Sequence, residues 1–290
     1  MEQLRHKAKN MKEWNESYYF NFYDPDKDIG GFTRIGFKPN IKEGVGYLFL
    51  FYKKEILAFN KKIEVSEVPE KIKTGPLEFF PGWKIVFSGK MTDGKIRDID
   101  LNLTYSEINR EFSYIECVDR EKFEMAKVVC EDHYEQIGFM KGEIRIDSEK
   151  YNISGFSERD HSWGERDWNA PKLWIYVTAH FDKDLGINFA KMRIKEREID
   201  VGFVMKKGKN IPVKRVSADT VSEGNTQKSF EYKVYDIKGD CYTLRGKVLK
   251  RVQIPYRRED RVSILNENLS VFECKNKRGF GIAEYLVRIR

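Results

Sequence analysis

Residues 155–174 contain the side chains in this chain that are best suited to chemistry. The segment, GFSERDHSWGERDWNAPKLW, holds three of the five tryptophans and one of the four histidines. Arginines stand between carboxylates at 158–160 and again at 165–167. Charged groups belong in water and tryptophan mostly does not, so this mixture predicts arginine–carboxylate pairs beside a partly closed apolar surface. In such surroundings a carboxyl or an imidazole acquires a shifted pKa.

Protonation of a carbon–carbon double bond is a reaction that these residue types could carry out. It needs a carboxylic acid that stays neutral at pH 7, aromatic faces for the resulting cation, and a base. The sequence offers Asp160 or Glu135 as the acid and His161 as the base. The aromatic walls would come from Trp163, Trp168 and Trp174.

The arginines of the segment would orient the reacting groups. Arg159 and Arg166 are placed to hold Asp167 and Glu165 by bidentate pairing. A structural alternative stays open for the whole segment, namely an ion-paired clasp that fixes two halves of the protein together. Perturbed charge networks serve both purposes, so sequence alone does not separate the two interpretations.

Metal and cofactor sites are not indicated. His133 and Glu135 would share one face of a strand and could be joined by His161 or His180, but no metal-motif spacing supports this set, and we expect no metal. The pair Gly279-x-Gly281 lacks the third glycine and the strand–turn–helix context of a dinucleotide loop. We therefore expect no cofactor.

Strands must position these residues, because short aromatic runs alternate with turn residues along most of the chain. Examples are YYFNFYDP, GGFTRIGFKPN and GVGYLFLFYKK, which begin at residues 18, 30 and 44. Residues 99–105 alternate between apolar and polar, as is typical of a half-buried antiparallel strand. Helical character is expected only at 1–14 and 106–130. Further strands are expected at 132–146, 187–194, 199–205, 230–237, 241–252, 270–275 and 281–289.

Residues 173–181 form the strongest alternation. One face of this predicted strand is ordinary core, with Leu173, Ile175, Val177, Ala179 and Phe181. The opposite face carries large rings with polar tips, which suit a ligand cavity or a covered sheet surface. The predicted substrate-binding residues are accordingly Trp163, Trp168, Trp174, Tyr176, His180 and His133.

Length and composition favour two all-β domains. The chain has 290 residues, and 14% of them are aromatic, which suits pleated, half-buried strands. We expect an N-terminal domain at 1–157 and a C-terminal domain at 158–290, each a closed or nearly closed antiparallel sheet with few short helices. The segment 155–174 would lie at their junction, beside an apolar cavity.

The pattern Gly155-x-x-x-x-Asp160-His161-x-Trp163-Gly164 resembles the carotenoid 1,2-hydratase (hydroxyneurosporene synthase) and AttH-like group. It looks closest to a sister family that carries a similar RDHSWG-x-RDW signature, here at 159–168, with an HYEQ-x-G segment and an aromatic YFNFYDP run. The resemblance implies tandem lipocalin-like barrels of the calycin type and a functional His161–Trp163 pair. The hydratases' Tyr-x-Asp pair has no counterpart at the expected distance.

These observations predict a cofactor-independent enzyme for a hydrophobic, isoprenoid- or lipid-like substrate, acting as a hydratase, cyclase or isomerase. The alternative is a non-catalytic carrier of such a molecule, whose cavity can be wholly apolar.

Charge and hydropathy limit the kinds of partner that the sequence predicts. The net charge is +7, but lysines and glutamates are mixed along the chain, which argues against nucleic-acid binding through the basic residues at 206–215. No stretch approaches the roughly 20 apolar residues of a spanning helix, although the N-terminal segment could contact a membrane surface. The N-terminus lacks a signal-peptide core and the four cysteines are widely spaced, so a cytoplasmic location is expected.

Overall fold

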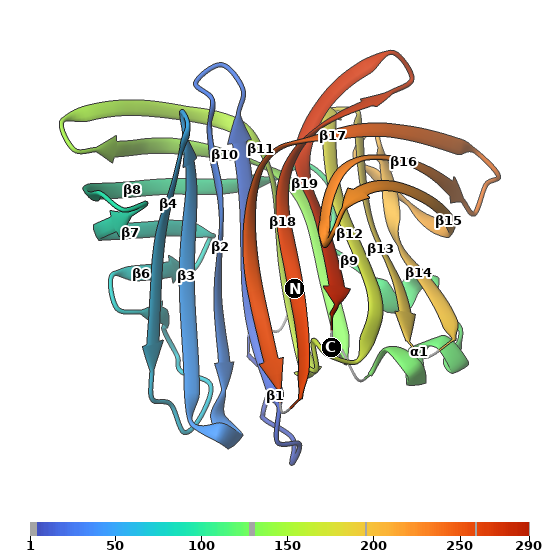
Figure 1. The fold of residues 1–290 in the computed structure, drawn as a ribbon, viewed down its shortest axis with the longest axis horizontal. Coiled ribbons are helices and arrows are strands. Elements are labelled where there is room, and N and C mark those ends of the chain that lie inside the picture. Colours follow the sequence, from blue (N-terminus) through green and yellow to red (C-terminus); the bar gives the residue numbers. More distant parts are fainter. Residues whose placement is uncertain (1–4, 128–130, 195, 259, 290) are drawn as a thin grey trace. The chain divides into compact units, whose positions relative to one another are not determined.

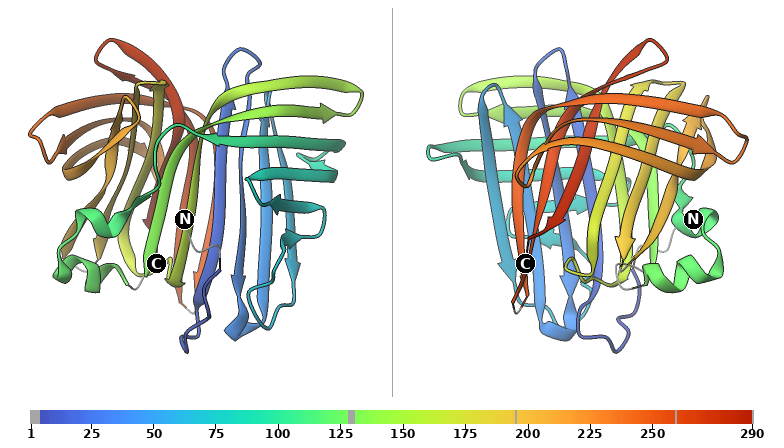
Figure 2. Two further views of the ribbon diagram at one scale, coloured as in Figure 1. Left: turned by 180° about the vertical axis from the view of Figure 1, so that it is seen from behind. Right: turned by 45° about the vertical axis from the view of Figure 1, so that its right-hand side comes forward.

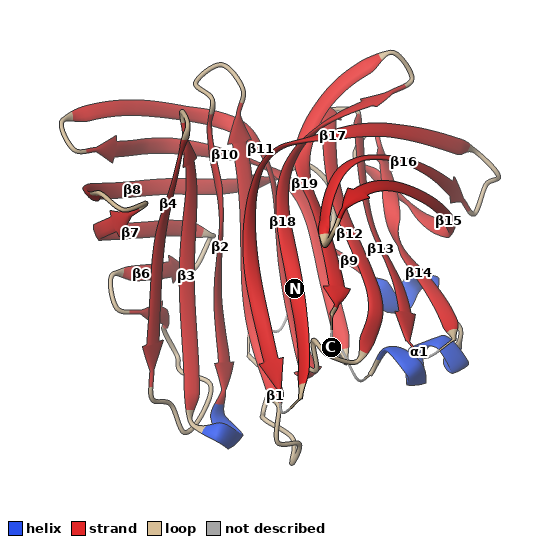
Figure 3. Cartoon of the chain, in the orientation of Figure 1, coloured by secondary structure: helices blue, strands red, loops and turns tan. Residues whose placement is uncertain are grey.

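Antiparallel strands make up nearly all of the computed structural model, which describes residues 5–127, 131–194, 196–258 and 260–289 (Figure 3). The chain forms two compact units, Met1–Ile108 with Cys130–Arg166 and Asn109–Val129 with Asp167–Arg290. The all-β class predicted from the sequence is confirmed. The chain passes from the first unit to the second after Arg166, inside the segment 155–174.

The first unit is one antiparallel sheet in which strands from both ends of its sequence are neighbours. Its order is β4-β3-β2-β1-β11-β10-β8-β7-β6-β5, and β4 also pairs with β7, so the sheet curls back on itself (Figure 1). The strands are β1 (Trp14–Asp24), β2 (Ile29–Lys38), β3 (Glu43–Tyr52), β4 (Glu55–Ile63), β5 (Ile72–Thr74), β6 (Leu77–Phe80), β7 (Lys84–Thr92), β8 (Ile96–Glu107), β10 (Asp132–Ile146) and β11 (Glu149–Glu165).

The apolar core of this unit lies on one face of the curled sheet. The alternation at 99–105 is confirmed, since Ile99, Leu101, Leu103 and Tyr105 are buried while the residues between them are largely exposed. Strand β1 differs, because all of its residues are buried. Its aromatic residues Tyr18, Phe20 and Phe22 join the core. Strand β1 therefore has two covered faces, and the polar residues on its second face need partners.

The second unit contains a closed barrel. Strand β12 pairs with β13 on one side and with β19 on the other, which closes the ring (Figure 2). All strands expected beyond residue 170 are present and are longer than predicted. The barrel strands are β12 (Pro171–Asp182), β13 (Leu185–Ile194), β14 (Arg197–Lys206), β15 (Lys209–Glu223), β16 (Thr226–Asp236), β17 (Cys241–Arg258), β18 (Arg261–Cys274) and β19 (Lys277–Arg288). Of these, β15 was not expected from the sequence.

The alternation at 173–181 separates the two faces of β12. Ile175, Val177 and Ala179 belong to the core of the barrel, as predicted. Trp174, Tyr176, Thr178 and His180 point to the opposite face, where each is no more than 4% exposed. Because the barrel core takes the apolar face, these amphipathic side chains occupy a covered sheet surface.

Within the described parts of the chain, helix is confined to short connections. The helical character expected at 106–130 is confirmed by the 3₁₀ turn η2 (Tyr114–Cys117) and the helix α1 (Arg120–Ala126), beside the short strand β9 (Phe112–Ser113). Another 3₁₀ turn, η1 (Pro39–Ile41), links β2 to β3. The helix expected at 1–14 is wrong for the described residues 5–13. There Asn40 Nδ2 donates to the carbonyls of Lys9 and Met11, at 2.7 Å each, and this side chain holds the segment in an irregular conformation.

Candidate functional site

Strand β11 presents its functional side chains on two opposite faces. His161 pairs with Tyr18 of β1 and with Tyr134 of β10, and Tyr18 belongs to the apolar core. Asp160 pairs with Tyr19 and Glu135, on the other face. Successive side chains of a strand point in opposite directions, so the predicted acid Asp160 and the predicted base His161 do not face each other.

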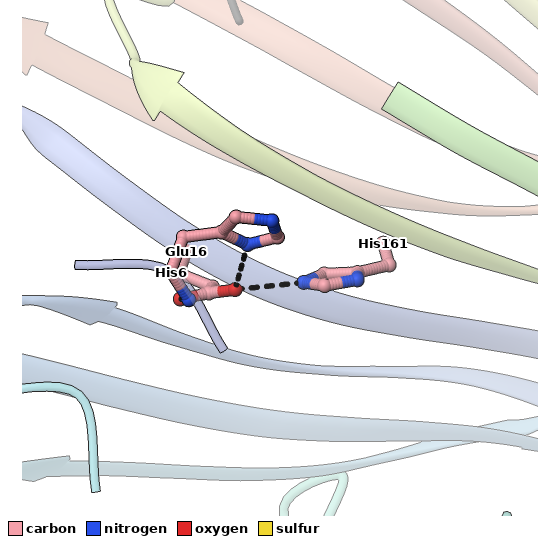
Figure 4. Close-up of side chains that lie close together, drawn as sticks. All are labelled: His6, Glu16 and His161. Carbon is pink, nitrogen blue, oxygen red and sulfur yellow. Dashed lines mark hydrogen bonds and ion pairs between the residues drawn. The ribbon is translucent and has the colours of Figure 1, made fainter. Parts of the chain in front are cut away.

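On the core face, His161 is hydrogen-bonded to a glutamate from β1. His161 Nε2 lies 2.9 Å from Glu16 Oε1, and both side chains are 0% exposed. His6 approaches the same carboxylate, with its Nδ1 2.8 Å from Oε1 and its backbone N–H donating to Oε2 at 2.9 Å (Figure 4). Glu16 thus joins an imidazole from the N-terminal segment to an imidazole from the middle of the chain.

The Glu16 carboxyl is ionised in this setting. Burial by itself raises its pKa, but the hydrogen bonds from His161 and His6 lower the pKa below the ordinary value of 4.5. An ionised carboxylate only accepts hydrogen bonds, so each imidazole donates its facing N–H. For His161 this places a proton on Nε2.

Aromatic rings enclose this pair. The His161 ring stacks on Tyr18 with centroids 4.5 Å apart, and Trp163 lies 5.2 Å away in a tilted arrangement. His6 stacks on Trp163 at 3.7 Å with an interplanar angle of 13°. His6, Tyr18 and Trp163 thus border the carboxylate–imidazole pair with flat, largely apolar surfaces, which strengthen electrostatic interactions by excluding water.

A buried arginine lies on the same face of β11. Arg159 Nε donates to Gln136 Oε1 at 2.7 Å, and its guanidinium lies 4.9 Å from the centre of the Trp83 ring. Arg159 is 2% exposed. At about 3.3 Å per residue along a strand, its Cα lies roughly 7 Å from that of His161. The core face of β11 therefore carries both an imidazole and a fixed positive charge.

The N-terminal segment that carries His6 is fastened to the first unit at several points. Lys9 forms an ion pair with Glu131, and Glu13 forms one with Lys38 at 2.8 Å. The Asn40 bonds described above hold the segment between these two pairs. We refer to residues 5–13 as the N-terminal strap.

The opposite face of β11 carries a cluster of acidic groups around one histidine. His133 Nε2 lies 2.9 Å from Glu135 Oε1 and 3.5 Å from Asp160 Oδ2. Burial raises the pKa of Glu158 well above its ordinary value, and the neighbouring Glu135 adds to the rise. Burial also acts to raise the pKa of Asp160, but His133, with Arg166 and Arg34, lowers it overall.

The remainder of the segment 155–174 belongs to the second unit. Trp168 meets Trp174 edge-on at 5.6 Å and stacks on Tyr256 at 5.4 Å. The Trp174 Nε1–H group donates to Glu284 at 3.0 Å. Trp168 and Trp174 therefore have partners of their own within the second unit, whereas Trp163 packs with His161 and His6 in the first.

The arginine–carboxylate pairing differs from the expected one. Asp167 pairs with Arg258 at 2.9 Å and with Arg261 at 3.8 Å. Arg166 Nη2 donates to Ser162 Oγ at 2.5 Å. Arg159, Arg166 and Asp167, for which the sequence predicts an orienting role, thus take part in three separate contacts.

His180 occupies a strongly desolvating position in the second unit. Burial lowers its pKa from the ordinary 6.5 to about 3, so its ring is neutral at physiological pH. Tyr176 shares the covered face of β12 with it.

A pocket of about 930 Å³ lies in the second unit beside α1. Its lining is mostly charged, with Arg120, Glu121, Glu124, Met125, Ile194, Glu196 and Arg197. None of the predicted site residues lines it.

Sequence reasoning overlooked Glu16 and His6. A signal for Glu16 was present, because it is the charged residue that shares the alternation of Tyr18, Phe20 and Phe22 on the core face of one strand. His6 carried no comparable signal, since its position depends on how the strap is fastened. Among the helices in the described residues, none is long and apolar enough to cross a membrane.

A family model described as a domain of unknown function (DUF7064) matches residues 2–289. No curated protein matches the sequence.

Three solved structures share the fold at low identity. A putative AttH from Nitrosomonas europaea has a TM-score of 0.65 at 12% identity, covering 94% of this chain and 92% of its own. CghA, in its structure with Sch210972, has a TM-score of 0.58 at 9% identity, covering 95% and 89%. Kievitone hydratase from Nectria haematococca has a TM-score of 0.57 at 10% identity, covering 93% and 88%. These likenesses concern the fold, and the all-β architecture implied by the resemblance to AttH-like proteins agrees with them.

Proposed function

This chain belongs to the DUF7064 family, and from that premise we propose that it is an enzyme that transfers protons to and from carbon in a small unsaturated hydrophobic molecule. His161 is the general acid–base, and Glu16 orients it. Hydration, isomerisation and ring closure are the three outcomes that such a proton transfer can start. The name of kievitone hydratase, a protein of similar fold, is in keeping with the first of these.

The hydrogen bond between Glu16 Oε1 and His161 Nε2 is the observation that carries this proposal. A buried carboxylate that holds an imidazole fixes its tautomer and stabilises the imidazolium once a proton is taken up. The pair lies among aromatic rings on the core face of the sheet, where an apolar substrate would be bound. A purely structural ion pair does not need its imidazole stacked against Tyr18 beside Trp163.

The strength of the acid points to the class of double bond. An imidazolium is a weak acid with an ordinary pKa near 6.5, and it transfers a proton readily only to a polarised double bond. We therefore favour a double bond conjugated to a carbonyl over an isolated alkene. Arg159, on the same face of β11, is placed to stabilise the negative charge that develops on such a carbonyl oxygen.

This mechanism does not use Asp160 or Glu135, the residues that the sequence offers as the acid. Asp160 and Glu135 lie on the opposite face of β11 and do not share a surface with His161. A mechanism on the core face accordingly uses one group, His161, which delivers a proton at one carbon and removes it at another. Trp163, which the family resemblance pairs with His161, forms part of the wall.

Deuterium incorporation tests the proposal directly. The protein would be incubated in D₂O with a panel of α,β-unsaturated ketones and isoprenoid alcohols, and products would be analysed by mass spectrometry. We expect deuterium at carbon, lost by about 10²–10⁴-fold in His161→Asn, the usual contribution of a general acid–base. Asp160→Asn, the adjacent residue on the other face, is the matched control and should retain incorporation.

The carrier alternative gives a different result in the same experiment. A carrier would quench tryptophan fluorescence on binding a panel member, and would incorporate no deuterium into it. Incorporation that persists in His161→Asn but disappears in Asp160→Asn would instead assign the chemistry to the other face of β11 and overturn the role given to His161.

A further inference from the structure

His133, Glu135 and Asp160 bring three metal-binding atoms together on adjacent strands. Glu135 and Asp160 are direct cross-strand neighbours in the pairing of β10 with β11, and His133 lies two residues before Glu135 on the same face of β10. The three ligand atoms lie within 4.8 Å of one another. One imidazole nitrogen and two carboxylate oxygens form a donor set that suits Zn²⁺ and similar divalent transition-metal ions.

The distances between these donors match the spacing around one ion. Two ligands at about 2.1 Å from a metal are about 3.0 Å apart at a right angle and about 3.4 Å apart at the tetrahedral angle. His133 Nε2 lies 2.9 Å from Glu135 Oε1 and 3.5 Å from Asp160 Oδ2. The strands thus hold the His133 nitrogen at a coordination spacing from both carboxylates.

The charge of these side chains is a second reason to expect a metal ion at this cluster. The carboxyl groups of Glu135 and Asp160 stand opposite each other on neighbouring strands, and like charges in that arrangement are destabilising. Buried carboxylates are retained in proteins when they are paired or when they coordinate metals. The Asp160 side chain is 17% exposed, which gives an ion a route from solvent to the otherwise buried cluster.

The other cluster of suitable residues is a weaker candidate for an ion. His6, Glu16 and His161 also bring their donors within 4.8 Å. However, both imidazoles there are hydrogen-bonded to the same oxygen, Glu16 Oε1, while Oε2 accepts a backbone N–H. That carboxylate already accepts three hydrogen bonds, so the core-face cluster has less need of a metal.

We infer that His133, Glu135 and Asp160 form a binding site for one divalent transition-metal ion of the Zn²⁺ type. The site lies on the face of β11 opposite His161 and does not depend on the function proposed above. The sequence offered His133 and Glu135 for this role, but the third ligand is Asp160, in place of His161 on the other face or His180 of the second unit.

Zinc titration tests this inference on the whole protein. Protein stripped with EDTA and dialysed would be titrated with ZnCl₂ by calorimetry, and with CoCl₂ by visible absorption, which reports Co²⁺ coordination. We expect one equivalent to bind. Glu135→Gln should weaken binding by more than about 10–100-fold, which is the effect of losing even an outer partner of a ligand.

The two clusters provide matched controls for each other. Glu16→Gln removes the carboxylate of the core-face cluster and should leave Zn²⁺ affinity unchanged. Binding that is lost in Glu16→Gln and retained in Glu135→Gln would overturn the assignment, as would the absence of binding to the wild-type protein. Asp160→Asn serves as the second variant if Glu135→Gln does not fold, and it should show the same loss of affinity and of the Co²⁺ absorption.

Discussion

Glu16 and His161 are 145 residues apart in the sequence, yet their side chains meet at 2.9 Å. The register of β1 against β11 explains the contact. Tyr18 stands directly opposite His161, and Glu16 stands opposite Trp163, so Glu16 is the diagonal neighbour of His161 on the same face. Diagonal neighbours on a sheet are within reach of long side chains. The contact is thus a consequence of strand pairing, and the following predictions depend on it.

Replacing Glu16 should destabilise the protein in a pH-dependent manner. The pKa of Glu16 is lowered in the folded state, so its contribution to the unfolding free energy is present above about pH 4.5 and is lost as the pH falls through the folded pKa. Glu16→Gln should cost about 1–3 kcal/mol at pH 7, the range for a buried group that loses a partner. The difference in unfolding free energy between wild type and Glu16→Gln should be smaller at acidic pH. Urea denaturation at pH 7 and pH 3.5 measures both values, with the exposed Glu70→Gln as control.

Weakening the N-terminal strap should expose the Glu16–His161 pair. The His6 ring stacks on Trp163 and bonds to Glu16, so His6→Ala removes both side-chain contacts and leaves only the backbone N–H bond to Glu16. We expect faster modification of His161 by diethyl pyrocarbonate and a changed Trp163 fluorescence. Lys7→Ala, at an exposed neighbouring position, should change neither. Equal modification rates in wild type and His6→Ala would show that the strap does not control access.

His180 should make the protein sensitive to mild acid. Its pKa is about 3 when folded and near 6.5 when unfolded, so the unfolded state binds the extra proton between these values. Stability contributed by the neutral ring is therefore complete above pH 6.5 and falls by about 1.4 kcal/mol per pH unit below it. His180→Gln should flatten this slope between pH 6.5 and pH 4 in chemical denaturation. Between pH 7 and pH 8 the unfolding free energies of wild type and His180→Gln should change with pH at the same rate, which is the internal control.

Gly138, the last residue of the HYEQ-x-G segment, should not accept a side chain. A Cβ at this position would lie 2.2 Å from the Tyr105 ring, whose hydroxyl donates to the carbonyl of Gln136 at 2.8 Å. Gly138→Ala should lower the unfolding free energy by about 1–3 kcal/mol, as overpacking of a core does. Gly89→Ala is the matched control in another strand, since its nearest neighbours lie 3.3–3.4 Å from the added Cβ. Equal melting temperatures for the two variants would contradict this explanation.

Strand positions were largely predictable because the relevant interactions are local. The alternation at 99–105 and at 173–181 gave both the strands and the correct core faces, since a strand with one apolar face has a period of two. The N-terminal segment was not predictable in the same way. Met11 and Trp14 have a helical spacing in the sequence. The segment is nevertheless fixed by distant partners such as Asn40.

The sequence by itself determined that residues 155–174 would be rich in charged and aromatic side chains, and it determined that Asp160 and His161 would face opposite ways once the segment was a strand. Which residues meet them was decided only by the tertiary structure. Strand pairing placed Glu16 of β1 beside His161, and it placed Glu135 of β10 beside Asp160. Pairing depends on register between strands far apart in the chain, and a shift of one residue would exchange the two faces. Local composition carries no record of that register, and so the partners could be found only in the folded protein.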